Sequence, residues 1–124
     1  MGQSFAMSRY LILAARFIAI CGITFLSLFA LDVFQDGVPL SEIALGLFIH
    51  LIPSFVLLAV FAISWFWPLA GGIAYMALST APFFLLGNPL WVNAMLAAPF
   101  SIAGLLFVFG AITKPKEVCP IEED

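Results

Sequence analysis

Polar and apolar residues fall into long blocks along this chain. Apolar residues fill four stretches, at about residues 10–31, 42–66, 68–86 and 89–112. A helix needs about 20 predominantly apolar residues to cross a bilayer, and the stretches are of that order. They lack the period-two alternation and the short length of barrel strands. The pattern predicts an all-α integral membrane protein, a bundle of four antiparallel transmembrane helices.

The junctions between these stretches carry residues that begin and end helices. Ser41 is suited to cap the second helix, and Pro68 suits the first turn of the third. Gly87, Asn88 and Pro89 supply a helix stop, a cap and a helix start in succession. Two of the three connections are therefore short, which favours antiparallel neighbours. The rival for the first stretch is a secretory signal peptide, although its apolar run exceeds the usual length of about 7–15 residues.

Composition strengthens the membrane interpretation. Of 124 residues, 65% are hydrophobic and 9% are charged, whereas soluble domains carry about 25% charged residues. The four Lys and Arg residues form no cluster that could follow a phosphate backbone, so nucleic acid is not an expected partner. The expected partners are the lipid bilayer and other membrane proteins or a second copy of this chain. Residues 113–124 are acidic and predict a flexible cytoplasmic tail.

The few basic residues predict an orientation. Arg9 precedes the first stretch and Lys114 and Lys116 follow the last, while the two predicted outer loops contain neither Lys nor Arg. The positive-inside rule then predicts a multi-pass protein of the cytoplasmic (inner) membrane with both termini cytoplasmic. Four residues are predicted to anchor the inner interface: Arg9, Arg16, Trp65 and Trp67.

Three stretches resemble a known family. Residues 29–34 read FALDVF, residues 46–53 read GLFIHLIP and residues 67–72 read WPLAGG. Together they resemble a family of small, uncharacterised four-helix membrane proteins of bacteria and archaea, classed as a domain of unknown function. The resemblance extends over most of residues 16–109. It implies a four-helix bundle and no particular activity.

Small and polar residues recur at spacings of three or four in two of the predicted helices. Such stripes let membrane helices approach closely, so we expect them to face the inside of the bundle, with a dimer interface as the alternative. The second helix carries Glu42, Gly46, His50 and Ser54, and the fourth carries Asn93, Ala97, Ser101 and Gly104.

Three prolines fall inside predicted helices, namely Pro53, Pro82 and Pro99. Each removes a backbone donor and frees the carbonyl four residues earlier, so each predicts a kink. Broken helices also build the ion sites of transporters. A structural kink is the simpler reading, and a transport site is the alternative.

One polar cluster is the candidate site. His50, the only histidine, lies about two turns into the second helix, and Asp32 and Asn93 lie near the same predicted depth. We expect these three side chains to meet in the outer half of the membrane. A structural, hydrogen-bonded histidine, a proton-handling group and an axial haem or chlorin ligand are its three readings. The sequence shows no catalytic motif and no metal-binding spacing, so we expect no cofactor and no metal.

The function remains open at this point. An accessory or interaction subunit within the membrane is the leading interpretation, because the chain has almost no soluble domain in which to carry out chemistry and few polar groups inside the predicted bundle. A small oligomeric transporter or channel is the second, and a membrane redox or lipid-modifying enzyme is the third.

Overall fold

A computed structural model describes residues 2–114, and within this range the chain is helical with no strand. Four segments are long and apolar enough to cross a membrane: Gly2–Val33, Leu40–Phe66, Pro68–Leu85 and Leu90–Ile112. The elements in order are α1 (Gly2–Leu28), the 3-10 helix η1 (Phe29–Val33), α2 (Leu40–Phe66), α3 (Pro68–Ser79), α4 (Ala81–Leu85) and α5 (Leu90–Ile112). The all-α prediction is confirmed.

Two boundaries differ from the sequence-based expectation. The first helix begins at Gly2, well before residue 10, because nothing between Gly2 and Arg9 interrupts helical hydrogen bonding. The third predicted helix is divided at Thr80 into α3 and α4. Pro82 supplies no backbone donor there, and the Thr80 hydroxyl donates to the Ala77 carbonyl (2.7 Å).

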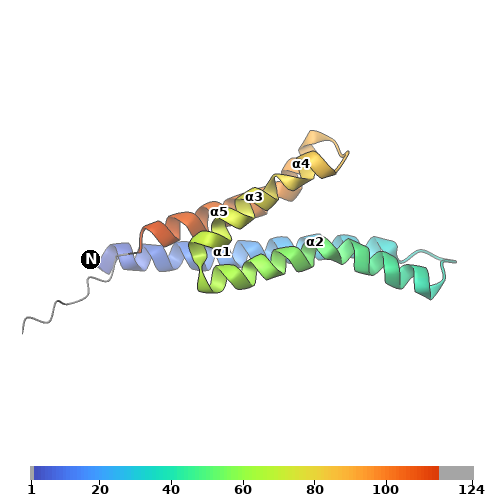
Figure 1. Cartoon of the computed structure of the whole chain (residues 1–124), viewed down its shortest axis with the longest axis horizontal. Helices are drawn as coiled ribbons and strands as arrows, with labels where there is room; N and C mark the ends of the chain where they lie inside the picture. The colour runs from blue at the N-terminus through green and yellow to red at the C-terminus, as the bar shows by residue number, and fades with distance from the viewer. Residues whose placement is uncertain (1, 115–124) are drawn as a thin grey trace, which may run out of the picture.

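The helices form two pairs that diverge towards one end of the molecule (Figure 1). α1 and α2 are joined through residues 34–39, where Gly37 adopts a left-handed φ of 85°. α5 lies along both α1 and α3, and α2 lies against α1 and α3. One pair consists of α3–α4 and α5, the other of α1 and α2, and the distance between the pairs increases towards α4 (Figure 1).

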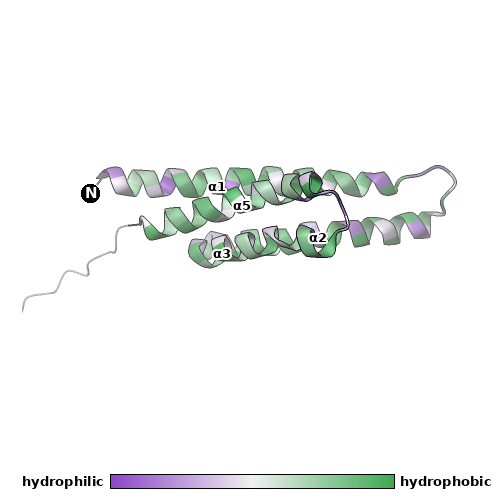
Figure 2. Cartoon of the chain, turned by 90° about the horizontal axis from the view of Figure 1, so that it is seen from above, coloured by the Kyte–Doolittle hydropathy of each residue, from purple (hydrophilic) through white to green (hydrophobic). Residues whose placement is uncertain are grey.

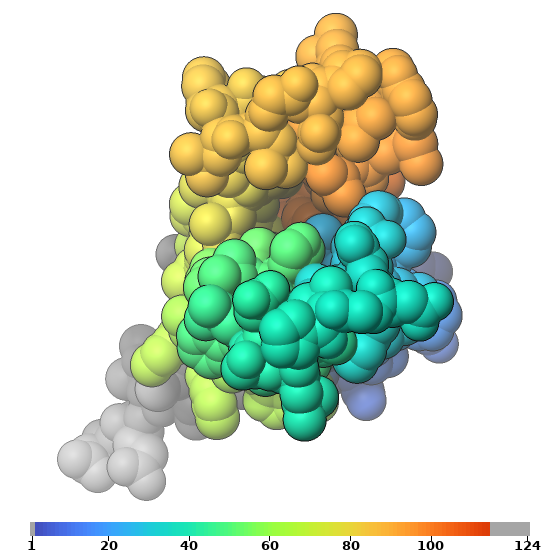
Figure 3. Space-filling view, turned by 90° about the vertical axis from the view of Figure 1, so that its right-hand side faces the viewer, coloured from blue at the N-terminus to red at the C-terminus, as the bar shows by residue number. Residues whose placement is uncertain are grey.

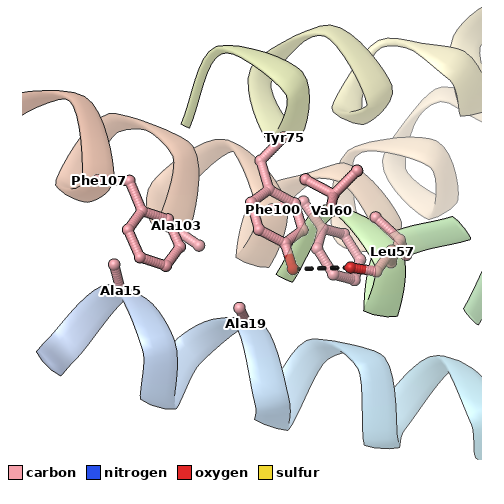
Figure 4. Packing of buried hydrophobic residues seen from close by; sticks show 8 residues of the cluster. All are labelled: Ala15, Ala19, Leu57, Val60, Tyr75, Phe100, Ala103 and Phe107. Carbon is pink, nitrogen blue, oxygen red and sulfur yellow. Dashed lines mark hydrogen bonds between the residues drawn. The ribbon is translucent and has the colours of Figure 1, made fainter. Parts of the chain in front are cut away.

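A small core lies where all four long segments meet (Figure 4). Tyr75 is fully buried, and its ring stacks on Phe100 and Phe107 with centroid separations of 5.9 and 6.0 Å. Its hydroxyl donates to the Leu57 carbonyl at 2.9 Å. Ala15 of α1 belongs to the same cluster. Many large apolar side chains on all four long segments are exposed, and hydrophobic residues occupy most of the length of the helices in Figure 2. Such a composition is expected of helices whose solvent is lipid.

Glycines allow the closest helix contacts. A Cβ built on Gly104 would meet the Gly72 carbonyl oxygen at 2.8 Å, and a Cβ on Gly72 would meet the Gly104 carbonyl oxygen at the same distance. Gly71 similarly faces the backbone of Ser64, across the contact between α2 and α3. In the α5 stripe, Gly104 and its neighbours at the same spacing face inward: Asn93 and Ala97 are buried, and Ser101 is half-buried.

Candidate functional site

The structure does not bring the predicted cluster of Asp32, His50 and Asn93 together. His50 is exposed, and its Nδ1–H donates within its own helix to the Gly46 carbonyl at 2.9 Å. Asp32 is exposed in η1. Asn93 is only 4% exposed. Neither His50 nor Asn93 therefore forms a hydrogen bond with Asp32, and no hydrogen bond between His50 and Asn93 joins α2 to α5.

Asn93 instead organises the turn that precedes α5. Its Nδ2 donates weakly to the carbonyls of Leu86 (3.5 Å) and Asn88 (3.4 Å). Its Oδ1 is buried and has no hydrogen-bond partner among the described residues. The Asn93 amide thus stabilises the connection between α4 and α5 through contacts within that connection.

The divergence of the two helix pairs separates Asn93 of α5 from Asp32 of η1 and His50 of α2. Figure 3 views the open end: the α4–α5 turn, in orange, lies above the α1–α2 end, and a hollow separates them. A cavity of about 300 Å³ occupies this region. Similar depth along the helices therefore did not imply proximity across them. The lining of this cavity is almost entirely apolar and consists of Leu26, Pro53, Val56, Leu57, Leu78, Ser79, Ala81, Pro82, Leu85, Leu86, Leu96 and Phe100.

The three prolines have different consequences for the backbone. α2 continues as an α-helix through Pro53, and α5 continues through Pro99. Only the segment with Pro82 is interrupted, two residues before the proline, at Thr80. Pro53 and Pro82 both line the cavity between the helix pairs, and Pro99 lines a second hollow of about 250 Å³ beside Gly22 of α1.

A second polar feature lies at the opposite end of α2. The Arg16 Cζ lies 3.8 Å from the centroid of the Trp65 ring, a close cation–π contact. Arg16 is half-buried, and its Nε is buried without a hydrogen-bond partner among the described residues. Arg9, by contrast, is exposed and lies 5.9 Å from the Phe5 ring centroid. Trp67, the fourth predicted anchor, is exposed between α2 and α3.

Sequence reasoning placed Arg16 and Trp65 at the same interface but missed their contact. The two residues lie on different helices, and no spacing rule relates them. Their common depth was the one available signal.

Most of the hydrogen-bonded hydroxyl groups among residues 2–114 donate to backbone carbonyls, and Ser27 and Ser54 also hydrogen-bond to each other between α1 and α2 (3.1 Å). The longest-range example is Ser8, whose hydroxyl donates to the Gly110 carbonyl at 2.6 Å and joins the start of α1 to the end of α5. Other hydroxyls donate within their own helices: Ser27 to Ile23, Ser64 to Phe61, Ser79 to Met76 and Thr113 to Phe109. Among residues 2–114, no group of three or more His, Cys, Asp or Glu residues could hold a metal ion.

These features define a class of protein: over residues 2–114 the chain is helical, four segments are long and apolar enough to cross a membrane, and polar side chains mainly form hydrogen bonds within the protein. The profile of one protein family, described as a domain of unknown function (DUF7670), matches residues 3–119. The chain belongs to this family. No curated protein and no solved structure matches it.

Proposed function

We propose that the chain spans the cytoplasmic membrane four times as an antiparallel bundle, with both termini in the cytoplasm, and that its family shares this arrangement in bacteria and archaea. Charge supports the orientation. Arg9 and Lys114 lie near the start of α1 and the end of α5, which the Ser8–Gly110 hydrogen bond holds together. The acids Asp32, Asp36 and Glu42 lie around the α1–α2 connection at the other end of these helices.

A series of reporter fusions tests the orientation. An enzyme that is active only outside the cytoplasm should give activity when fused after Gly37 or Gly87, and none after Trp67 or Asp124. This alternation follows from four spans combined with the positive-inside rule. Activity after Asp124 together with silence after Gly37 would reverse the orientation, and activity at neighbouring junctions would remove a span.

Within that membrane, we propose that the protein acts as a non-catalytic accessory or interaction subunit. The observation that carries this proposal is the use of its polar groups. The hydroxyls of Ser8, Ser64, Tyr75 and Ser79 donate to backbone carbonyls, so they fasten helices or helical turns. Because these polar groups stabilise the fold, the surface that the protein presents to the bilayer is mainly apolar. We propose that this surface binds other membrane components by helix packing.

A small oligomeric transporter is the second candidate, and the cavity between the helix pairs favours it. Two helical prolines, Pro53 and Pro82, line that cavity, and α3 is interrupted beside it. Interrupted helices around a cavity at membrane depth are a feature of transporters. The third candidate, a redox or lipid-modifying enzyme, has no observation in the described residues that favours it.

Photo-crosslinking in the membrane separates these candidates. A crosslinking amino acid is placed at one exposed position on each long helix (Phe17, Phe48, Ile73 and Ile102) and at fully buried Ala103 as the control. An accessory subunit should give a product of distinct mass from one face, with nothing intermolecular from Ala103. A ladder at multiples of the chain's own mass would favour the oligomeric transporter. Lipid adducts alone from all four exposed positions would contradict both proposals.

A further inference from the structure

The inner ends of the helices form a step. α2 and α3 meet at Trp67, and Figures 1 and 2 show this turn stopping well short of the start of α1. Arg16 contacts Trp65 in the last turn of α2. Because α1 rises about 21 Å from Gly2 to Arg16 at 1.5 Å per residue, its first turns project beyond the step. We call Arg16 and Trp65, the two residues in contact there, the Arg16 step.

We propose that the Arg16 step binds the phosphate group of an anionic membrane lipid. The site is distinct from the cavity between the helix pairs. It rests on the proposed membrane insertion but not on the proposed role as an accessory subunit, and it needs no partner protein.

The first argument is the missing counter-charge. All described acidic residues, Asp32, Asp36 and Glu42, lie at the other end of the helices. Asp32 is about 25 Å from Arg16 along α1 and η1. A guanidinium in apolar surroundings is costly without an opposite charge. The described residues supply an aromatic face and no carboxylate, so the anion must come from elsewhere.

The second argument is the geometry of the guanidinium. Trp65 covers one face of it at 3.8 Å, and its Nε is buried in the protein without a hydrogen-bond partner among residues 2–114. None of the hydrogen bonds or ion pairs within residues 2–114 engages the terminal Nη donors. A planar guanidinium held in this way presents a fork that suits two phosphate oxygens.

The third argument is the setting, which favours a lipid over a soluble anion or an acidic partner. Trp65, Phe66 and Trp67 are all exposed around the turn, and exposed Trp residues are typical of the headgroup level of a membrane. α2 ends and α3 begins at this turn, while α1 extends beyond it. A lipid headgroup can therefore bind at the turn, beside α1.

The test measures lipid preference at Trp65. The chain has three Trp residues, so Trp67→Phe with Trp91→Phe leaves Trp65 as the only indole. This protein is placed in phosphatidylcholine nanodiscs with increasing phosphatidylglycerol that carries brominated acyl chains. We expect saturable quenching that brominated phosphatidylcholine does not reproduce. Arg16→Gln should lower the relative binding constant for phosphatidylglycerol about tenfold.

Arg9→Gln is the matched control, because it removes the same charge from an exposed position on the same helix. It should leave the binding constant nearly unchanged. Equal losses of phosphatidylglycerol affinity in the two variants would show a general electrostatic attraction to anionic lipid and would overturn the proposal of a specific site. If Arg16→Gln does not fold, Arg16→Lys serves instead: it keeps the charge but lacks the fork, so binding should weaken measurably, and unchanged binding would contradict the geometry.

Two further arms identify the source of the anion. Inorganic phosphate added to phosphatidylcholine nanodiscs should neither protect the protein thermally nor compete with phosphatidylglycerol. Effective competition would assign the step to a soluble phosphate. Truncation after Lys116 removes four of the seven acidic residues, and it should leave lipid binding unchanged. A large gain in lipid binding would show that the chain's own carboxylates occupy the step, which would overturn the proposal.

Discussion

Gly104→Leu should prevent stable packing of α5 on α3. The position has no room, because even a Cβ there would lie 2.7 Å from the Met76 Cγ and 2.8 Å from the Gly72 carbonyl oxygen. Backbone atoms cannot move aside as the end of a flexible side chain can. Overpacking typically costs about 1–3 kcal/mol, and we expect the free energy of unfolding to fall by at least about the upper end of that range.

The control for this change is Ala98→Leu. Ala98 lies on the same helix, is exposed, and receives the same leucine side chain on a face that does not pack against another helix. Reversible unfolding of both variants in detergent or bicelles gives the comparison. Gly104→Ala should fall between the control and Gly104→Leu, since it adds only the clashing Cβ. Equal stability of Ala98→Leu and Gly104→Leu would show that α3 and α5 are not in contact at Gly72 and Gly104.

The periodicity and length of the apolar stretches were enough to predict an all-helical chain with four segments able to cross a membrane. Both properties are local, because helical hydrogen bonds and spanning length depend on neighbouring residues. The small stripe of α5 was also predictable in part, since Gly104 and Ala97 are buried. Small side chains are the residues that let helices approach, whatever the partner helix is.

The lateral arrangement of the helices could not be predicted in the same way. Asp32, His50 and Asn93 were expected to meet because they share a depth, but a depth does not specify which helix faces which. The two pairs diverge at the end of the molecule that holds the interruption at Thr80 and the cavity lined by Pro53 and Pro82. The pairing of Arg16 with Trp65 is equally non-local. Sequence spacing contains no information on either.

The same limit applies to the centre of the core. Nothing in the sequence distinguishes Tyr75 from the other aromatic residues, many of which face outward: Phe17, Phe48 and Phe84 are all exposed. Its position between Phe100 and Phe107 is set by the crossing of α3 and α5. A single buried hydroxyl then finds an acceptor on α2. Tyr75 therefore joins three helices through two kinds of contact, and these contacts can be separated by mutation.

Tyr75→Ala should be among the most destabilising truncations in the chain, and Tyr75→Phe should be mild. Removing a fully buried aromatic ring typically costs about 3–5 kcal/mol, because the cavity that remains collapses only partly. Tyr75→Phe keeps both ring contacts and loses only the hydrogen bond to the Leu57 carbonyl. Side-chain hydrogen bonds between membrane helices average about 0.6 kcal/mol, so the loss in unfolding free energy should be of that size.

Tyr10→Phe, at a position 72% exposed, removes the same hydroxyl from the surface and should leave the unfolding free energy unchanged. A loss for Tyr75→Phe as large as that for Tyr75→Ala would mean that the hydroxyl, not ring packing, holds α2 against α3. No loss in either variant would place Tyr75 outside the folded core.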